Sequence, residues 1–229
     1  MLRNPDTIIV FEWHWITINM TLIMTWLVML LLVFVSVMIT RRLTSKGELS
    51  KGQNLLEALI DLINNQIKEV SGKTPGQYLP FIGTLFIFIA ISNILTIVPG
   101  YTAPTSSLST TVALAISVFI AVPVFGISNQ GIKNYLRQYI KPNVLMLPFN
   151  IIGELSRTLS LAVRLYGNIM SGSIIVGILL TITPLIFPII MQAFGLLIGI
   201  IQAYIFAILA MVYIASASEA TKKKQEGGE

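Results

Sequence analysis

Five long apolar stretches constrain this chain more than any other feature of its sequence. They cover residues 16–40, 79–99, 108–128, 144–180 and 186–216. A helix needs about 20 apolar residues to cross the hydrocarbon core of a bilayer, and each stretch is long enough. Charged residues make up only 11% of the 229 residues, against roughly a quarter in soluble domains. The sequence therefore predicts a single all-α membrane domain and excludes a soluble enzyme or a nucleic-acid-binding domain.

Two residue types are scarce enough to limit the chemistry. The chain has no Cys, which excludes a disulfide framework, a thiol nucleophile and a thiolate metal site. Its single histidine, His14, excludes a multi-histidine metal cluster. No glycine-rich phosphate-binding loop of the Walker type is present either. We therefore expect no catalytic site, no cofactor and no metal.

Lysine and arginine mark one side of the five-span arrangement. The two loops on the other side, 100–107 and 181–185, contain neither residue. The basic clusters that follow spans one, three and five are Arg41, Arg42, Lys46, Lys51, Lys68 and Lys73; Lys133, Arg137 and Lys141; and Lys222, Lys223 and Lys224. Cytoplasmic loops are enriched in such residues. This pattern predicts an external N-terminus (1–15), a cytoplasmic tail (217–229) and a location in a bacterial or archaeal plasma (inner) membrane.

Residues 50–71 form a sixth helix that does not span the membrane. Apolar residues recur there at helical spacing, whereas Glu57, Asp61 and Lys68 occupy the other side. This amphipathic pattern predicts a helix lying on the cytoplasmic interface. The alternative is a helix packed on another, soluble subunit.

The last two apolar stretches are too long to stand upright in a bilayer. At 1.5 Å per residue, 150–180 alone makes about 46 Å of helix, against a hydrocarbon core of about 30 Å. Pro184 prevents one continuous helix through the turn. We therefore expect a long, strongly tilted helical hairpin shaped against another component in the membrane.

A polar stripe runs along the first helix of this hairpin. At 100° per residue its members fall within roughly 60° of Arg157. They are Asn150, Glu154, Arg157, Ser160, Arg164, Asn168 and Ser171. Charge is expensive inside a bilayer, so a polar face there lines water or pairs with a partner. Glu154 and Arg157 are spaced for a local ion pair near the cytoplasmic entrance.

Arg164 lies near the centre of its stretch and has no carboxylate nearby in sequence. Glu154 lies ten positions before it, and no acid follows it until Glu219. Its counter-charge should therefore come from another subunit or from the transported ion; a structural or snorkelling arginine is the alternative. On the last helix, Gly195 and Gly199 are spaced to let two helices approach closely. Gln202 supplies an inward-facing amide beside the arginine.

At these residues the chain resembles subunit a of the F-type ATP synthase. The segment Ser156–Ile169 matches the family pattern around its essential arginine, which falls on Arg164. A second match runs from Ile201 to Phe206 around Gln202, and weaker matches occur in 52–60 and 92–111. The chain departs from the family in carrying Ser173, Gly195 and Asn150 where many members have acidic, ionisable and acidic residues.

The resemblance implies a non-catalytic stator subunit that provides two half-channels to the rotating ring of subunit c. Its outer half-channel would be built from Asn168, Ser171, Gln192 and Gln202, with Ser109 and Thr110 at the mouth. Its cytoplasmic half-channel would be built from Asn150, Glu154, Ser156, Arg157 and Ser160. Arg164 would separate the two. The ring of subunit c, the peripheral-stalk subunit b, the remaining synthase subunits and the lipid bilayer are the implied partners.

The ion implied by the resemblance is the proton, and sodium remains open because the ion-binding carboxylate belongs to subunit c. Two other functions are possible for a chain of this composition. A secondary transporter would use an internal binding site, often with inverted repeats, and no repeat of fixed period is found here. A structural membrane scaffold would not need the polar stripe.

Overall fold

The fold is described from a computed structural model of the chain. It describes residues 9–13, 16–41, 51–72, 75–98, 100–140, 145–183 and 186–219. Most of the predicted N-terminal segment and tail, and the basic residues Arg42, Lys46, Lys73, Lys141 and Lys222–Lys224, lie outside this part. The described tail residues, Ala217 to Glu219, continue the last helix.

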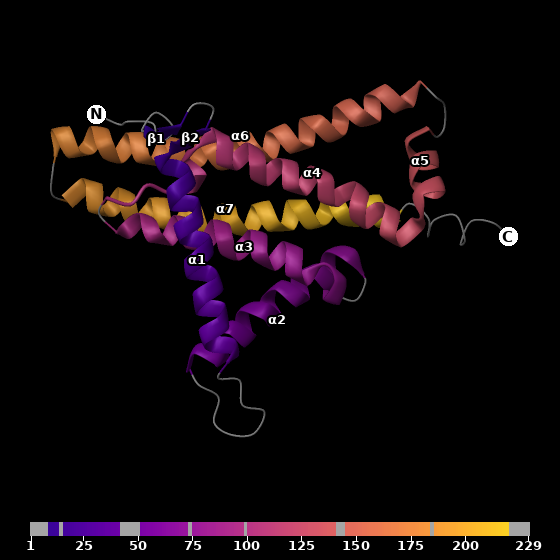
Figure 1. Ribbon diagram of the computed structural model, residues 1–229, viewed down its shortest axis with the longest axis horizontal. Helices are drawn as coiled ribbons and strands as arrows, with labels where there is room; N and C mark the ends of the chain where they lie inside the picture. The colour runs from indigo at the N-terminus through magenta and orange to yellow at the C-terminus, as the bar shows by residue number, and fades with distance from the viewer. Residues whose placement is uncertain are drawn as a thin grey trace.

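Seven α-helices make up most of the described chain (Figure 1). They are α1 (Met20–Thr40), α2 (Lys51–Ser71), α3 (Leu79–Ile94), α4 (Leu108–Gln130), α5 (Ile132–Ile140), α6 (Met146–Ile182) and α7 (Ile186–Glu219). Short 3-10 turns are η2 (Pro75–Gln77), η3 (Leu95–Ile97) and η4 (Pro104–Ser106). Two antiparallel strands, β1 (Ile9–Trp13) and β2 (Ile16–Asn19), precede α1.

The prediction of five membrane helices is confirmed. Helices long and apolar enough to cross a membrane occur at 20–38, 79–97, 108–130, 146–182 and 186–217. The first boundary was wrong, because the apolar run from Ile16 includes β2 and the helix begins only at Met20. Hydropathy does not separate strand from helix here. The β-branched residues of Ile16-Thr17-Ile18 favour extended backbone.

Four helices form a bundle in which α7 is central. It contacts α3, α4 and α6, and α4 also packs against α6. The side of α7 that faces the bundle is rich in alanine, with Ala203, Ala207 and Ala210 buried around Phe206. Small side chains allow helix backbones to approach closely, and van der Waals contact is a main source of helix association in lipid. The alanine face therefore explains why α7 accepts so many neighbours.

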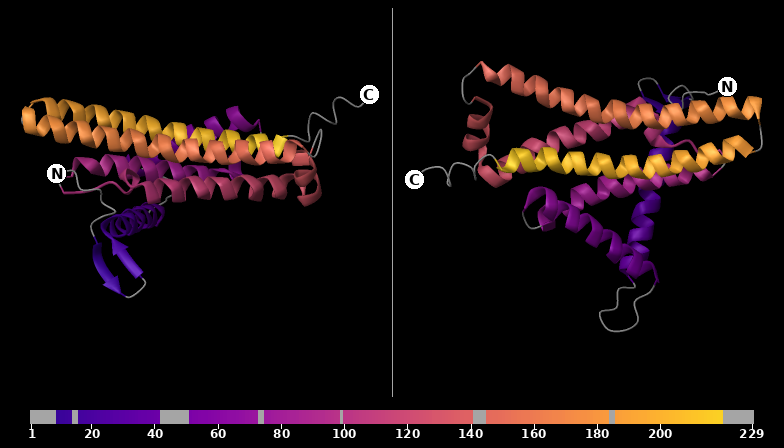
Figure 2. Two further views of the ribbon diagram at one scale, coloured as in Figure 1. Left: turned by 90° about the horizontal axis from the view of Figure 1, so that it is seen from above. Right: turned by 180° about the vertical axis from the view of Figure 1, so that it is seen from behind.

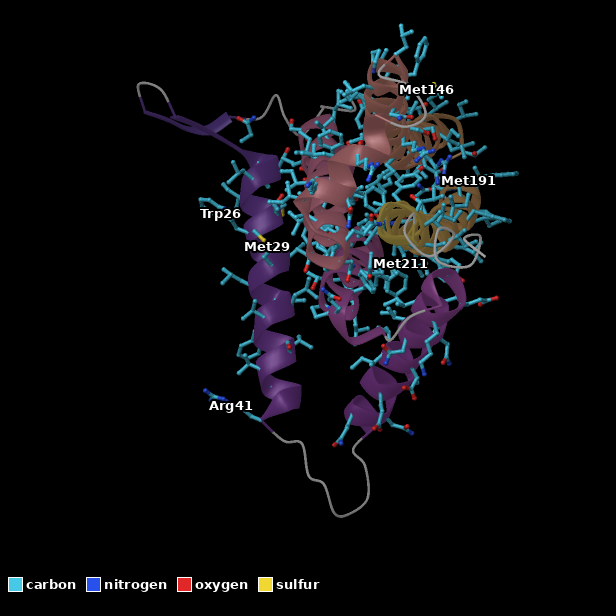
Figure 3. All side chains as sticks on the ribbon, turned by 90° about the vertical axis from the view of Figure 1, so that its right-hand side faces the viewer. Trp26, Met29, Arg41, Met146, Met191 and Met211 are labelled. Carbon is cyan, nitrogen blue, oxygen red and sulfur yellow. The ribbon has the colours of Figure 1, made fainter. Side chains whose placement is uncertain are left out.

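Helix α1 stands apart from this bundle. It runs crosswise to the long pair α6 and α7 (Figure 1), and in Figure 3 most of its surface is free of neighbours. Trp26 is 52% exposed and points away from the bundle. Its one fully buried residue among those described is Val28. A helix with such an exposed apolar surface is suited to contact with lipid or another membrane subunit.

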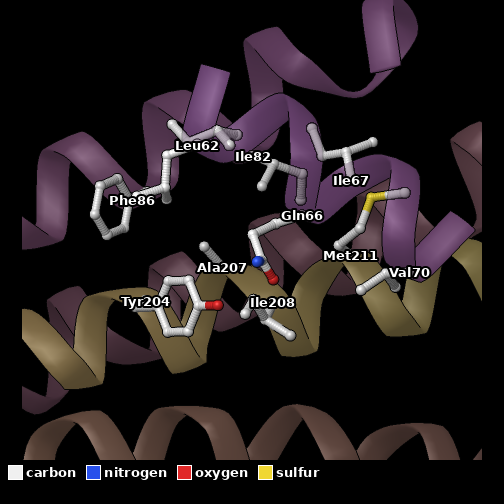
Figure 4. A pocket seen from close by; sticks show the side chains of 11 residues that line it. Leu62, Gln66, Ile67, Val70, Ile82, Phe86, Tyr204, Ala207, Ile208 and Met211 are labelled. Atoms are coloured by element: carbon white, nitrogen blue, oxygen red, sulfur yellow. The ribbon is translucent and has the colours of Figure 1, made fainter. Parts of the chain in front are cut away.

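Helix α2 is amphipathic, and part of its apolar side packs on this chain's own α3 and α7. Ile63 and Ile67 are buried there, whereas Glu57, Asp61 and Lys68 are exposed. Figure 4 shows the small apolar pocket at this contact, where Gln66 of α2 lies opposite Tyr204 of α7. The contact with the chain's own helices was not predicted from the sequence. The interfacial position of α2 stays a prediction.

Helix α5 was missed by the sequence analysis, which treated its region as a basic loop. Gly131 separates it from α4 and has a φ of +79°, a backbone conformation that favours glycine. The ring of Tyr135, 6% exposed, lies against Gly126 of α4. The same end of the bundle is tied by Gln130, whose amide donates to the carbonyl of Ala217 at 2.6 Å. Helix α5 thus closes one end of the bundle.

We predict that Gly126→Ala destabilises this end of the bundle. A Cβ atom at Gly126 would lie 2.6 Å from the Tyr135 ring, so the ring must be displaced at a cost of about 1–3 kcal/mol. Gly153→Ala is the matched control because its Cβ meets nothing within 4 Å and alanine favours the helix. Unfolding midpoints of the purified chains in detergent test this, and equal midpoints for the two variants would contradict it.

Candidate functional site

Helix α6 carries the polar stripe and is the least buried of the long helices in the bundle. It spans 37 residues, yet its buried residues are Leu161, Ala162 and Leu165 only. Pro148 lies in its first turn, where no helical hydrogen bond is lost. Because these three residues occupy one narrow side, the polar stripe is left at the margins of the bundle and on its exposed surface.

The first half of the stripe opens into a cavity of about 520 Å³, called here the Glu154 cavity. Asn150, Glu154 and Arg157 of α6 line it together with Tyr213 and Ser216 of α7. The guanidinium carbon of Arg157 lies 5.7 Å from the centroid of the Tyr213 ring, a cation–π distance. The contact described for Arg157 is therefore with α7, and its ion pair with Glu154 stays a prediction.

The second half of the stripe opens into a separate cavity of about 410 Å³, called here the Gln192 cavity. Its polar lining residues come from α3, η3, the following loop, α6 and α7. They are Asn93, Thr96, Tyr101, Asn168, Ser171, Ser173 and Gln192. The side-chain amide of Gln192 donates to the carbonyl of Thr96 at 3.1 Å, which joins α7 to η3 across this cavity.

Gln202 links the two long helices next to this cavity. It is 4% exposed, and its Oε1 atom accepts a hydrogen bond from Nδ2 of Asn168 at 3.5 Å. Its own Nε2 atom is buried and has no hydrogen-bond partner. A buried amide donor without a partner is costly unless water or an incoming group satisfies it. The inward position predicted for Gln202 is thus found in the structure.

Arg164 lies between the two cavities on α6 and lines neither. It is seven residues beyond Arg157 and four before Asn168, or about 10 Å and 6 Å along the helix axis. Its side chain is exposed. Within the part of the chain that the structure describes, it makes no ion pair or hydrogen bond. A permanent cation therefore faces outward from the middle of a membrane helix.

Four other predicted site residues do not line either cavity. Ser156 and Ser160 are exposed on α6, on the same open surface as Arg164. Ser109 is exposed and Thr110 is half-buried in the first turn of α4, away from the Gln192 cavity. The loop before α4 instead contributes Tyr101 to that cavity.

Asn93 is the polar residue whose role the sequence analysis missed. It is 4% exposed, and its Nδ2 atom donates to the carbonyl of Gly199 on α7 at 2.9 Å. Its Oδ1 atom accepts a hydrogen bond from the hydroxyl of Thr105 at 3.0 Å. An asparagine inside an apolar span was the available signal, because polar side chains in membrane helices commonly bind a neighbouring helix. Asn93 fixes α3, η4 and α7 to one another.

The two glycines of α7 differ in their surroundings, although the sequence suggested that both permit close packing. A Cβ atom at Gly199 would lie 3.0 Å from Cβ of Asn93, so α3 does approach α7 there. A Cβ atom at Gly195 meets nothing within 4 Å, and Gly195 lines the Gln192 cavity. The close approach therefore depends on Gly199 alone.

Three hydroxyl groups near the Gln192 cavity are buried without hydrogen-bond partners. They belong to Ser92, Tyr101 and Thr102. Burial raises the pKa of Tyr101 to about 12, and the nearby Ser92 hydroxyl has a smaller, lowering effect on that pKa. The two hydroxyls do not form a hydrogen bond with good geometry. Tyr101 thus stays protonated at neutral pH. It is the only titratable side chain that lines this cavity in the described chain, so the lining carries no net charge.

The geometry defines a class of protein before any comparison is made. It is an integral membrane protein of helices, with cavities that contain polar side chains on either side of an arginine in an apolar helix and, among the described residues, no cluster suited to hold a metal ion. Comparison with family models matches residues 22–215 to the ATP synthase A chain. The chain belongs to this family.

Similar proteins support the assignment over nearly the whole length. The chain is 58% identical to ATP synthase subunit a 2 of Acaryochloris marina over 96% of this chain and 94% of that protein. It is 55% identical to ATP synthase subunit a of Albidiferax ferrireducens over 100% and 99%. It is 55% identical to ATP synthase subunit a 1 of Chlorobium luteolum over 97% and 100%. The chain is therefore a non-catalytic membrane subunit of the ATP synthase complex.

We predict that Gly199→Ala weakens the contact between α3 and α7. The new methyl group would lie 3.1 Å from Nδ2 of Asn93, so the asparagine must shift by a few tenths of an ångström. This shift weakens its hydrogen bond to the Gly199 carbonyl, at a cost of up to about 1 kcal/mol. Gly195→Ala is the matched control on the same helix. The unfolding midpoint in detergent should fall only for Gly199→Ala, and a similar fall for both variants would show that the contact with Asn93 is not the cause.

Proposed function

We propose that this chain is the stator subunit that carries cations past the rotating ring of subunit c, through two half-channels separated by Arg164. The observation that carries the proposal is the position of Arg164. It is an exposed cation on α6 between two cavities that each contain polar side chains. A charge at the centre of a membrane helix costs about 2.5–3.5 kcal/mol or more, so a partner must cover it.

The surface around Arg164 is suited to contact with apolar helices that carry a carboxylate. Leu159 and Val163, which precede the arginine on α6, are 61% and 59% exposed. On α7, Phe194 and Leu197 are each 57% exposed. A ring of subunit c, with one acidic residue in each apolar hairpin, is the partner that family membership implies. Its carboxylate would supply the counter-charge that the described part of this chain does not.

The two cavities are proposed as the half-channels. By the positive-inside rule, the lysines and arginines beside α2 and α5 favour a cytoplasmic position for the C-terminal end of α7. The Glu154 cavity, which includes Ser216 near that end, would then face the cytoplasm. The Gln192 cavity then faces the outside. In this arrangement Ser109 and Thr110 lie near the outer surface without lining the path, and Ser156 and Ser160 face the ring beside Arg164.

A cation entering the Gln192 cavity would meet neutral oxygen atoms and the amides of Asn168 and Gln202 before it reaches a ring carboxylate. The loaded carboxylate is neutral and can turn into the lipid, whereas an ionised carboxylate is held by Arg164. After almost a full rotation the cation would leave through the Glu154 cavity. The fixed charge of Arg164 repels cations between the cavities, and this repulsion prevents a direct leak.

The identity of the ion is decided mainly by the ring in this proposal. The described residues that line the Gln192 cavity offer only neutral groups, because Tyr101 has a pKa of about 12. Neutral oxygens hydrate or coordinate a cation without choosing strongly between a proton carried by water and Na⁺. Pumping measured with and without Na⁺, in the presence of a protonophore, tests the proton: persistence of pumping in Na⁺ would assign sodium instead.

The length of α6 and α7 supports a strong tilt. At 1.5 Å per residue the 37 residues of α6 make about 55 Å of helix, and both helices run crosswise to α1 in Figure 1 and Figure 2. If α1 crosses the membrane upright, the pair lies strongly inclined and follows the side of the ring. The peripheral-stalk subunit b and the other synthase subunits are proposed as further partners from family membership.

We predict that Gln202→Leu impairs ATP-driven pumping while the complex still assembles. Leucine has a similar size but cannot accept the hydrogen bond from Asn168 or hydrate the cation path. Gln66→Leu is the matched control, because Gln66 lines the apolar pocket between α2 and α7, away from both cavities. Pumping in vesicles with matched subunit content should fall at least several-fold for Gln202→Leu alone. Normal pumping would limit Gln202 to helix packing.

We predict that Arg164→Ala abolishes ion-driven ATP synthesis and ATP-driven pumping without preventing insertion. Loss of a central cation makes insertion easier by about 2.5 kcal/mol or more, so misfolding is not the expected cause. Passive ion leak should persist or rise because the fixed charge between the half-channels is gone. Arg164→Lys should also fail, since a desolvated ammonium loses its proton readily and lacks the planar guanidinium.

The measurement is pumping and passive leak in vesicles with matched subunit content. Normal coupled pumping by the alanine variant would overturn the proposal. A chain acting as a secondary transporter would instead move its substrate without a ring of subunit c, and a scaffold would tolerate both substitutions.

A further inference from the structure

Helix α5 lies where three of the candidate membrane spans begin or end. The spans at 108–130 and 146–182 are the helices on either side of it along the chain. A third span ends at Ala217, whose carbonyl accepts the hydrogen bond from Gln130 at the end of α4. Figure 1 shows α5 at this end of the bundle, crosswise to α4 and α7. Because spans end where the hydrocarbon core ends, we expect α5 at the level of the lipid headgroups.

Four side chains of α5 form two neighbouring exposed strips. At 100° per residue, Ile132 and Leu136 lie about 60° and 100° around the helix from Tyr135, which is buried against α4. These two apolar residues are 62% and 56% exposed. Lys133 and Arg137 lie about 160° from Tyr135, and both are exposed. An apolar strip therefore borders a basic strip that points away from α4.

The charge of the basic strip is not neutralised by acidic side chains nearby. Within the part of the chain that the structure describes, Lys133 and Arg137 make no ion pair. The sequence has no Asp or Glu between Glu69 and Glu154, so α3, α4 and α5 carry no carboxylate side chain. A negatively charged group from outside these helices is therefore the natural partner of the strip.

Helix α2, the other amphipathic helix, lacks both properties. Its lysine Lys68 is accompanied by the exposed acids Asp61 and Glu69. Its buried apolar residues, Ile63 and Ile67, pack on the chain's own bundle. Helix α5 instead combines unopposed positive charge with an apolar strip that its own chain leaves exposed.

We propose that α5 is a docking site for anionic phospholipids, with Ile132 and Leu136 against the acyl chains and Lys133 and Arg137 on the headgroup phosphates. Long basic side chains can keep their charge in the headgroup region while their stems cover apolar surface. Basic residues beside a membrane span attract anionic lipid. Because α5 contacts both α4 and α6, the bound lipid holds the end of the bundle at which α6 begins.

Quenching of a fluorescent label by brominated lipid tests which lipid lies beside α5. The chain has no native Cys, so a bimane label is attached at Ile132→Cys in a complete synthase whose other accessible cysteines are replaced by serine. The complex is reconstituted in vesicles of equal parts phosphatidylglycerol and phosphatidylcholine. One preparation carries bromine on the phosphatidylglycerol chains and the other on the phosphatidylcholine chains. Bromine quenches only at close contact, so the ratio of the two quenching values reports the lipid beside α5.

Brominated phosphatidylglycerol is expected to quench at least about two-fold more than brominated phosphatidylcholine. High salt shortens the range of charge interactions and should lower this ratio. Lys133→Gln combined with Arg137→Gln should make the two quenching values equal. Lys68→Gln is the matched control, because it removes an exposed lysine from α2, where acids surround it, and it should leave the ratio unchanged.

Equal quenching by the two lipids in the parent would overturn the proposal, since contact with lipid would not depend on charge. Absence of quenching by either lipid would also overturn it, because water or another subunit would then cover α5. Lys133→Arg combined with Arg137→Lys keeps both charges and should keep the ratio; a lost ratio there would contradict recognition by charge. The parent ratio and its salt dependence decide the question even if the glutamine variant assembles poorly.

Discussion

The need to solvate Arg164 inside a membrane is the constraint on which the rest of the structure depends. A guanidinium stays charged under all physiological conditions, so helix α6 cannot bury this side chain among the apolar residues of its own bundle. The helix instead packs through Leu161, Ala162 and Leu165 and leaves the arginine exposed. This exposure is the basis for the proposed partner with a negative charge, and it accords with the few residues of α6 that its own chain buries.

A helix left open on one side must be held firmly from the other, and α7 serves this purpose through polar contacts as well as apolar ones. The side-chain amide of Asn93 donates a hydrogen bond to the Gly199 carbonyl of α7. Three residues further along α7, Gln202 accepts a hydrogen bond from the side-chain amide of Asn168 on α6. Apolar side chains gain little from association in lipid, because the lipid tails are equally apolar. Hydrogen bonds with defined geometry therefore fix the rotation of α7 and, through it, the position of α6.

The sequence predicted the spans and the polar stripe, because hydropathy and helical periodicity depend on local order alone. The sequence-based prediction was wrong at Ile16, where an apolar run forms a strand before the helix begins. It also missed the short helix α5, which is held by the contact of Tyr135 with Gly126. The role of Asn93 was also missed, since its partners Thr105 and Gly199 are distant in sequence. Which stripe residues line cavities depended on the packing of α4 and α7 and could not be read from α6.

The two cavities differ in charge, and this difference bears on how an ion would pass. The Glu154 cavity contains a carboxylate and a guanidinium, whereas the described lining of the Gln192 cavity is neutral because Tyr101 remains protonated. Neutral dipoles hydrate a cation without binding it tightly, so entry would not wait for a side chain to release a proton. The partnerless hydroxyls of Ser92, Tyr101 and Thr102 need water in any case. In the proposed mechanism, a hydrated entry path with a neutral lining leaves the separation of charge to Arg164, which lines neither cavity.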